Sequence, residues 1–153
     1  MRKYMELAIK KAMSGVRKGE SPFGACIVKG KEVVVVAHNT VLSKKDATNH
    51  AEMNAIRLAC KRLGSHKLKG CVIYSTTEPC PMCFAAIHWA GISKIVFGTN
   101  INDVKELGFS ELTISDKKMK REGRADIKIK PDFMRKENLE LLEFWKKRHG
   151  RTY

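Results

Sequence analysis

Hydrophobic and polar positions alternate along the chain with two distinct periods. Apolar residues recur every three or four positions from Met5 to Val16, with Lys and Arg between them, which predicts an amphipathic helix that ends near Gly19. The run Val33 to Ala37 predicts a strand that is buried on both faces. The helical period predicts further helices over 50–63, 79–90, 102–107 and 136–148. Apolar and β-branched runs predict strands over 24–28, 33–37, 71–76, 94–98 and 127–130.

The order of these elements predicts the fold class. A helix, a hairpin and then alternating helices and strands give a three-layer α/β/α domain, with helices on both faces of a mixed five-stranded sheet. The strand–helix–strand units around His50 and Cys80 are expected to be right-handed crossovers between adjacent parallel strands. Pro79 is expected in the first turn of the second helix of this pair. A chain of this length is predicted to form one domain, residues 1–153.

Composition excludes several classes of protein. No stretch approaches the ~18 consecutive apolar residues of a membrane span. A hydrophobic fraction of 43% beside 30% charged residues argues against disorder. The N-terminal residues lack the apolar core of a signal peptide, so we expect a cytoplasmic protein with no membrane partner.

The chain is strongly basic, with a net charge of +14. Residues 117–153 hold thirteen basic and six acidic residues and so supply +7 of this total. We therefore divide the chain into a core, residues 1–110, and a basic C-terminal extension, residues 111–153, that ends in a helix. Such charge is typical of proteins that bind nucleic-acid phosphates, but a solvated, Lys-rich surface explains it equally well.

Five cysteines in a chain without an export signal favour metal binding or buried thiols over disulfides. Cys26, Cys60 and Cys71 lie in apolar patterns and are predicted to be small core residues. Cys80 and Cys83 form a Cys-x-x-Cys pair at the start of a predicted helix, where the helix dipole favours the thiolate.

A second motif, His50-Ala51-Glu52, opens the preceding predicted helix. The His50 imidazole and the thiolates of Cys80 and Cys83 suit one tetrahedral Zn²⁺ ion per chain, with the fourth position open for water. Glu52 lies two residues beyond His50 and can stand beside that water as a proton carrier. A redox pair or a structural zinc knuckle is the alternative, but no further Cys or His has the paired spacing of a structural site.

The motifs His50-Ala51-Glu52 and Pro79-Cys80-x-x-Cys83 resemble the zinc-dependent cytidine-deaminase-like superfamily. The likeness extends over residues 4–109. Two further segments and Asn39 are similar to bacterial guanine deaminases and tRNA adenosine deaminases; the segments are Ser21-Pro22-Phe23-Gly24-Ala25 and Thr77-Glu78-Pro79-Cys80-Pro81-Met82-Cys83. The resemblance implies a deaminase domain with zinc ligands at His50, Cys80 and Cys83, a catalytic Glu52, and an Asn39 that contacts the base or its ribose.

The reaction that the resemblance implies is hydrolytic deamination of a base or nucleoside. Glu52 would take a proton from the zinc-bound water and protonate a ring nitrogen, while the hydroxide attacks the amino-bearing carbon. Glu52 would then help the amine leave as ammonia. Backbone N–H groups near Ala51 and Cys80 are expected to bind the substrate or stabilise this geometry.

Several residues favour a small purine as the substrate. Phe23 and the segment Gly108 to Glu111 resemble guanine deaminases, in which an acidic residue near Glu111 contacts the guanine. The chain ends in Tyr153, as several members of that branch do, and the tail is expected to help close the active site. We therefore predict conversion of guanine to xanthine and ammonia. Trp89 is a further candidate for substrate contact. Core packing is the alternative for Phe23 and Trp89, and a solvated loop charge is the alternative for Glu111.

Other substrates stay open. Asn49 stands where the family usually has Ala beside the ligand His, and it is expected to add a polar group near the pocket. The basic C-terminal quarter makes tRNA adenosine the first alternative substrate, with inosine as the product, and cytosine or cytidine the next. A zinc-stabilised RNA-binding module without enzymatic activity is the last alternative.

Two further expectations concern the C-terminal region and assembly. One of three glutamates is a candidate second carboxylate of the active site: Glu137, Glu140 or Glu143. Relatives are usually oligomers, so a homodimer is expected, with Trp89, Phe144 and Trp145 as candidates for its interface.

Overall fold

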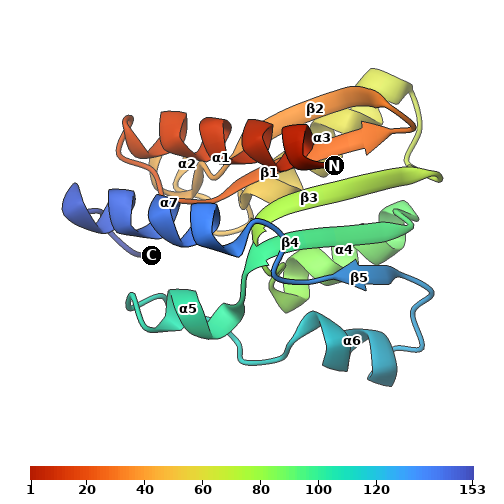
Figure 1. The fold of residues 1–153 in the computed structure, drawn as a ribbon. Coiled ribbons are helices and arrows are strands. Elements are labelled where there is room, and N and C mark those ends of the chain that lie inside the picture. Colours follow the sequence, from red (N-terminus) through yellow and green to blue (C-terminus); the bar gives the residue numbers. More distant parts are fainter.

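The computed structural model describes all residues 1–153, which form one five-stranded sheet with helices on both sides (Figure 1). The strands are β1 (Gly24–Lys29), β2 (Glu32–His38), β3 (Cys71–Thr77), β4 (Lys94–Thr99) and β5 (Lys128–Lys130). The helices are α1 (Arg2–Val16), α2 (Val41–Lys44), α3 (Ala51–Leu63), α4 (Pro81–Ala90), α5 (Ile101–Lys105), α6 (Asp116–Glu122) and α7 (Arg135–Lys147). The predicted α/β fold with a mixed sheet is confirmed.

The strand order is β2-β1-β3-β4-β5. Strand β1 runs antiparallel to both β2 and β3, whereas β3, β4 and β5 are parallel to one another. The unit β3-α4-β4 therefore joins adjacent parallel strands, as predicted. The prediction of adjacent strands for the unit around His50 is wrong, because β1 lies between β2 and β3. Strands β1 and β2 form a hairpin, and β3 pairs with β1 on the side away from β2.

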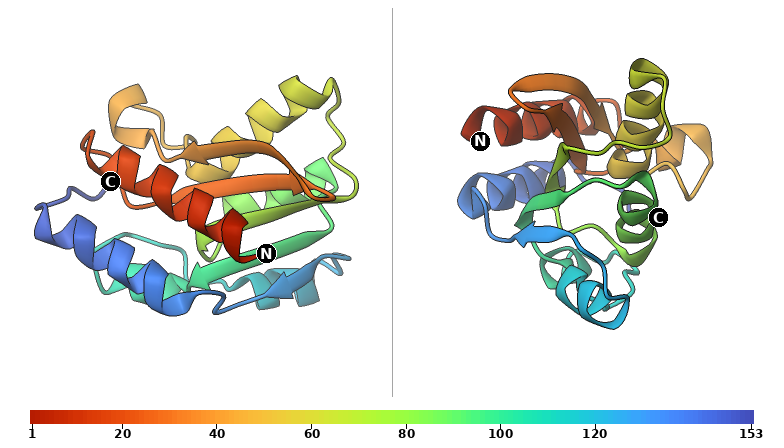
Figure 2. Two further views of the ribbon diagram at one scale, coloured as in Figure 1. Left: turned by 45° about the horizontal axis from the view of Figure 1, so that its top comes forward. Right: turned by 90° about the vertical axis from the view of Figure 1, so that its right-hand side faces the viewer.

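The central strands are buried on both faces, and the two faces pack against different helices. Ala25 and Ile27 of β1 belong to the larger core, with the buried faces of α3 and α4. Cys26 and Val28 point the other way, into a smaller core with Tyr4 and other residues of α1. Figure 2 shows α1 and α7 on one side of the sheet and α3 and α4 on the other. Strand β1, rather than β2, is thus the strand of the hairpin that is enclosed on both faces.

Strand β2 is an edge strand whose side chains are mostly only partly buried, which corrects the prediction that it is buried on both faces. Only Val34 and Ala37 are buried in it. Side chains of α3 bind part of its free edge: the Asn54 amide donates to the His38 carbonyl at 3.0 Å, and Arg62 donates to the Val34 carbonyl at 2.8 Å. These bonds satisfy edge carbonyls that would otherwise be free to pair with another strand. The apolar run reflects contact with α1 and α3 on its two faces.

Several boundaries differ from the predictions. Helix α4 begins at Pro81, which takes the first helical position, and Pro79 lies outside the helix. Helices α2 and α6 were not predicted, because they are four and seven residues long and lack an apolar stripe. No helix combines the length and the apolar character that crossing a membrane requires.

The C-terminal region packs on the rest of the sheet. Helix α7 contacts α1 and β4, and β5 pairs with β4. Trp145 is buried in the larger core, so the prediction of an interface position for it is wrong. Glu140 and Glu143 are exposed on α7, and Glu137 forms an ion pair with Arg2. Within one chain these three glutamates thus lie on the opposite side of the sheet from α3 and α4, and their role as a second carboxylate stays a prediction.

Candidate metal centre and active site

The two sequence motifs lie at the starts of α3 and α4, which are neighbouring helices on one face of the sheet. His50 is the N-cap residue of α3 and Cys80 is the N-cap residue of α4, both with extended backbone angles. A side chain at this position usually accepts a hydrogen bond from its own helix. Neither His50 nor Cys80 does so. Their side chains are therefore available to meet each other across the gap between the helices.

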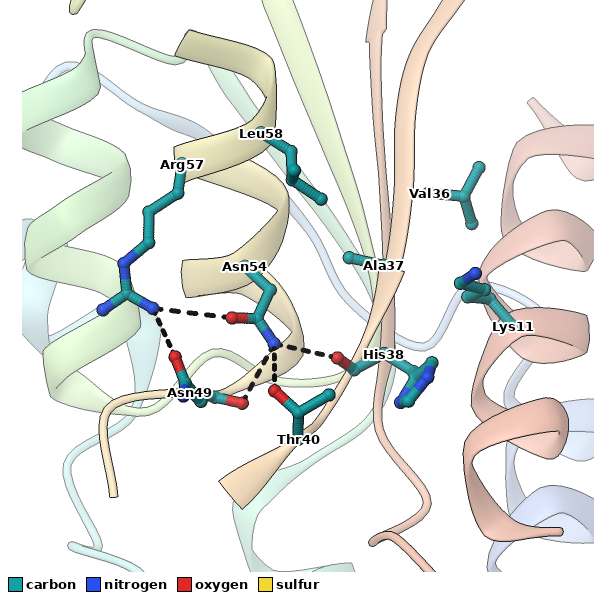
Figure 3. Close-up of a pocket in the computed structure, with 9 residues that line it drawn as sticks. All are labelled: Lys11, Val36, Ala37, His38, Thr40, Asn49, Asn54, Arg57 and Leu58. Carbon is teal, nitrogen blue, oxygen red and sulfur yellow. Dashed lines mark hydrogen bonds between the residues drawn. The ribbon is translucent and has the colours of Figure 1, made fainter. Parts of the chain in front are cut away.

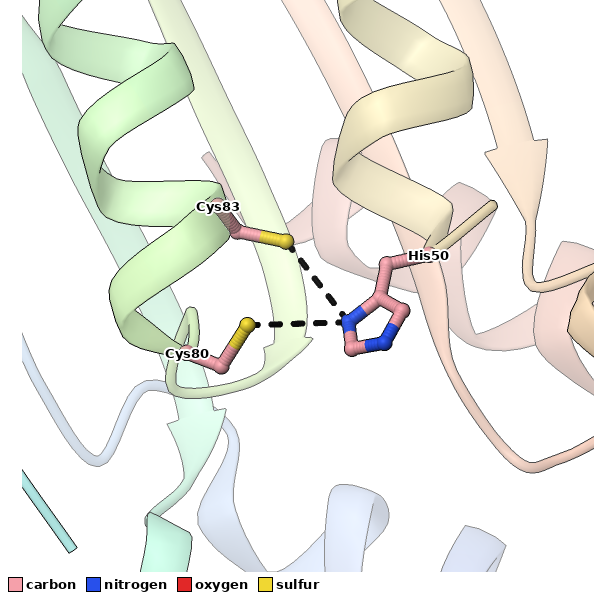
Figure 4. Close-up of side chains that lie close together, drawn as sticks. All are labelled: His50, Cys80 and Cys83. Atoms are coloured by element: carbon pink, nitrogen blue, oxygen red, sulfur yellow. Dashed lines mark hydrogen bonds between the residues drawn. The ribbon is translucent and has the colours of Figure 1, made fainter. Parts of the chain in front are cut away.

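His50, Cys80 and Cys83 form a compact cluster (Figure 4). The His50 Nδ1 atom lies 3.7 Å from each of the two sulfur atoms, and all three atoms lie within 4.8 Å of one another. Nitrogen and sulfur ligands at ~2.0 and ~2.3 Å from a tetrahedral zinc ion are roughly 3.6 Å apart. The donor set and its spacing thus fit zinc, with three protein ligands and one open position.

Burial and mutual hydrogen bonding shift the pKa values of the three cluster residues. Hydrogen bonding from Cys83 lowers the pKa of Cys80 to about 4, and the neighbouring His50 adds to this effect despite burial. The pKa of Cys83 is raised, because Cys80 takes the shared negative charge and because Cys83 is buried. Burial lowers the pKa of His50, but the hydrogen bond to Cys80 and the negative charge of Glu52 outweigh it and raise the pKa overall. One sulfur is therefore anionic and ready to bind a cation.

Glu52 lies beside the cluster in the first turn of α3. It is 5% exposed, one carboxylate oxygen accepts a hydrogen bond from Ser75 at 2.9 Å, and the other lies 3.6 Å from the Cys83 sulfur. Burial raises the pKa of Glu52, while the neighbouring His50 opposes this shift. Ser75 holds the Glu52 carboxylate in place, and this role was not predicted from the sequence. The one indication in the sequence is that Ser75 is a polar residue in a buried strand.

Asn39 and Tyr153 meet at the other side of His50. Asn39 follows β2 and is fully buried; its side-chain oxygen accepts from the Val41 N–H at 3.0 Å, and its amide nitrogen donates to the Tyr153 hydroxyl at 2.9 Å. The same hydroxyl lies 3.3 Å from His50 Nε2. Burial raises the pKa of Tyr153, so the hydroxyl keeps its proton at neutral pH. The tail thus reaches the predicted site.

Aromatic side chains support the tail. The Phe109 ring lies 5.6 Å from the Tyr153 ring, 5.2 Å from Trp145 and 5.0 Å from Phe23, measured between ring centroids. Phe23 is buried in the larger core and reaches the site through Phe109. Core packing therefore describes Phe23 in this chain.

Glu111 and Trp89 were both predicted as substrate contacts, and the structure separates them. Glu111 is half-buried, and burial together with the negative charge of Cys80 raises its pKa to about 6. A fully solvated loop charge does not describe it. Trp89 is 73% exposed on α4, so the alternative of core packing is wrong, and its ring lies beside His88 rather than His50.

Asn49 does not point toward the metal cluster. Its side-chain oxygen accepts a hydrogen bond from Arg57 at 2.6 Å, and its backbone oxygen accepts from Asn54 (Figure 3). These residues line a cavity of about 360 Å³ between α1, β2 and α3. The expectation that Asn49 adds a polar group to the predicted pocket is therefore wrong. Ala51 is fully buried as the first residue of α3, beside His50.

Comparison with known proteins agrees with this geometry. The family model described as "Cytidine and deoxycytidylate deaminase zinc-binding region" matches residues 1–99. The chain belongs to this family. The predictions of a zinc-binding domain and of a hydrolytic deaminase of nucleobases or nucleosides are therefore confirmed, and the non-enzymatic alternative falls away.

Relatives within the family carry different activities. The guanine deaminase of Bacillus subtilis (strain 168) is 40% identical over 109 residues, which cover 71% of this chain and 70% of that protein. The tRNA-specific adenosine deaminase of Aquifex aeolicus (strain VF5) is 46% identical over 94 residues, 61% of this chain and 62% of that protein. A solved structure from a study of tRNA A34 deaminases has a TM-score of 0.82 at 30% identity, covering 93% of this chain and all of that one. The relatives thus include one named for guanine and others named for adenosine in tRNA.

Proposed function

We propose that the protein deaminates a free purine base, with guanine converted to xanthine and ammonia. The observation that carries this proposal is the contact of the C-terminal tail with the metal cluster. Tyr153 lies over His50 and bonds to Asn39, and Glu111 faces the same charged groups from the loop after α5. A site covered by a tail in this way suits a small planar ligand better than a nucleotide within a polymer.

The proposed zinc ligands are His50, Cys80 and Cys83. When bound, zinc would lower the pKa of a water molecule toward ~7 and so supply the nucleophile for hydrolysis. The fit rests on the 3.7 Å separations from His50 Nδ1 and on the anionic Cys80. The Cys83 thiol is buried, and the negative charges of Cys80 and Glu52 lie beside it. A bound cation would offset these charges and replace the thiol proton.

Glu52 is proposed as the proton carrier. Burial raises the pKa of Glu52, which favours the protonated form of a carboxyl group that has to take up a proton and release it again. It would accept the first proton lost by water and donate it to a ring nitrogen. It would then take the second proton, from the hydroxyl group added to the ring carbon, and donate it to the departing amine. Water and guanine then give xanthine and ammonia, with every proton accounted for. Ser75 keeps the carboxylate in place during these transfers.

Asn39, Ala51 and Glu111 are proposed to bind the base. Glu111 is partly protonated near neutral pH and can accept or donate a hydrogen bond at a purine edge. The Ala51 backbone lies at the start of α3, where free N–H groups favour electron-rich ligand atoms. The Asn39 amide is fixed by its bond to the Val41 N–H.

Adenosine in tRNA is the second candidate. The tRNA-specific deaminase of Aquifex aeolicus and the solved tRNA deaminase structure are both close relatives. Basic residues also follow one another at the end of α7 and in the tail that leads to Tyr153, namely Lys146, Lys147, Arg148 and Arg151. These cations would contact phosphates near the site if the tail opened.

Ammonia release from a substrate panel tests the proposal. The panel contains guanine, guanosine, adenine, cytosine and a tRNA, with the Glu52→Ala variant as the blank and Glu106→Ala, an exposed glutamate on the same protein, as the control. We expect release from guanine by the wild type and the control but not by the blank. No release from any small compound, together with inosine in the tRNA, would contradict the proposal and establish the second candidate.

We also propose that the protein is a homodimer. Trp89 is 73% exposed and Leu112 is 65% exposed, which are large apolar side chains to leave in water. Molar mass from light scattering would test this, and a mass of 17.3 kDa at micromolar concentration would contradict it.

A further inference from the structure

The hydroxyl group of Tyr153 joins the metal cluster to the base-contacting side of the site. Asn39 donates to it from one direction at 2.9 Å, and His50 Nε2 lies 3.3 Å away in another. The Asn39 amide cannot be turned over without loss, because its oxygen accepts the Val41 N–H. Its nitrogen therefore faces Tyr153, and the tyrosine oxygen is an acceptor in this bond.

The two ring nitrogens of His50 have separate partners. Nδ1 faces both sulfur atoms, so it is the nitrogen that would bind the metal. A neutral imidazole that binds a metal through one nitrogen carries its proton on the other. The His50 Nε2–H group then points at the Tyr153 oxygen, which has two lone pairs and can accept from both His50 and Asn39.

We infer that Tyr153 is a positioning residue for the metal ligand His50, holding its ring and its Nδ1-binding tautomer while also holding Asn39. This inference rests on the proposed function only for the zinc ligands, and it does not depend on the identity of the substrate. Partners of this kind orient metal-bound histidines and raise their basicity, and losing one typically costs 10–100-fold in metal affinity or activity.

The aromatic packing places the hydroxyl where it is needed. The Tyr153 ring packs edge-on against Phe109, which packs against the buried Trp145. The chain passes Trp145 at Gly150, where any Cβ atom would overlap the indole ring. The ring packing is independent of the hydroxyl, so a phenylalanine at position 153 would keep the tail in place and remove only the two hydrogen bonds.

The test compares Tyr153→Phe with Tyr4→Phe and measures zinc binding without substrate. Tyr4 is a buried tyrosine of α1 whose hydroxyl donates to the Lys31 carbonyl, so its variant also loses one hydroxyl bond but lies outside the site. Competition with a chromophoric chelator gives the apparent zinc affinity. We expect a loss of about 10-fold or more for Tyr153→Phe and no change for Tyr4→Phe.

Two further measurements separate positioning from general weakening. The visible absorption of the Co²⁺-loaded protein should change in Tyr153→Phe and not in Tyr4→Phe, because it reports the ligand geometry. In Asn39→Ala the additional effect of Tyr153→Phe on zinc affinity should be smaller than in the wild type, since the three groups act as a unit.

Equal zinc affinity and equal Co²⁺ spectra for Tyr153→Phe and the wild type would overturn the inference and leave the proposed function intact. The opposite combination of results can also be recognised. Weaker zinc binding by Tyr153→Phe, together with a wild-type protein that deaminates no purine base, would support the inference and refute the proposed substrate.

Discussion

Asp116 is a buried carboxyl group with no hydrogen-bond partner for either oxygen. It is the first residue of α6, and its backbone N–H donates to the Glu78 carboxylate at 2.9 Å. Burial, and after it the negative charge of Glu78, raises the pKa of Asp116 from 3.8 to about 9. The folded protein therefore holds Asp116 as the neutral acid at pH 7.

The sign and size of the effect on stability follow from this difference. Above pH 3.8 the unfolded chain releases a proton that the folded state keeps. The contribution of Asp116 to the free energy of unfolding is therefore fully present below pH 3.8 and is lost progressively as the pH rises toward 9. At pH 7 the unfolded carboxyl group is about three pH units above its pKa. At ~1.4 kcal/mol per unit, the folded state is disfavoured by roughly 4 kcal/mol.

The substitution Asp116→Asn keeps the shape of the side chain and cannot ionise. We expect it to raise the free energy of unfolding by about 2–4 kcal/mol at pH 7, somewhat less than the full cost, because the buried amide also lacks partners. The exposed Asp126, four residues after the end of the same helix, supplies the control Asp126→Asn.

Urea unfolding at fixed zinc concentration measures the effect at pH 6, 7 and 8. The difference in stability between Asp116→Asn and the wild type should widen by about 1.4 kcal/mol for each pH unit, while Asp126→Asn follows the wild type. A difference that is constant with pH, or a variant less stable than the wild type throughout, would refute the reasoning, because Asp116 would then be ionised in the folded protein.

Three further predictions concern the cluster and the core. His50→Ala should lose most of its zinc, because only two thiolates remain, and a full complement by metal analysis would disprove the ligand assignment. Glu52→Ala should keep one zinc ion per chain but lose ammonia release, since only the proton carrier is removed; undiminished turnover would disprove its role. Gly24→Ala should cost about 1–3 kcal/mol or more in urea unfolding, because its Cβ would overlap the Ala8 backbone oxygen. An unchanged midpoint would contradict that packing.

The metal cluster could be predicted from sequence because its determinants are local. Cys80 and Cys83 are fixed relative to each other by one helical turn, and His50 begins the helix that lies beside them. Each motif directly precedes or opens a buried helix whose apolar face is visible in the sequence. Because α3 and α4 pack on the same face of the sheet, the starts of the two helices bring the three ligand atoms close together.

The errors concern features that depend on distant parts of the chain. The apolar run in β2 is the same for a central strand and for an edge strand that has a helix on each face, and pairing with β1 alone decides which it is. Asn49 is drawn away from the site by Arg57, two turns further along α3. Nothing in the sequence near Asn49 indicates that bond.

Glu78 shows why the substrate side of the site is harder to predict than the metal side. It lies two residues before Cys80, in the same motif, yet its carboxylate bonds to the start of α5 through the Ile101 N–H at 3.2 Å and to the start of α6 through the Asp116 N–H at 2.9 Å. The segment between these helices carries Glu111, so the motif that positions the metal ligands also anchors the starts of the two helices that flank it. The sequence shows the motif, but the loop takes its place only when about thirty residues of chain after the motif have folded back. A change at Glu78 is therefore expected to displace the segment that carries Glu111 before it disturbs the metal cluster.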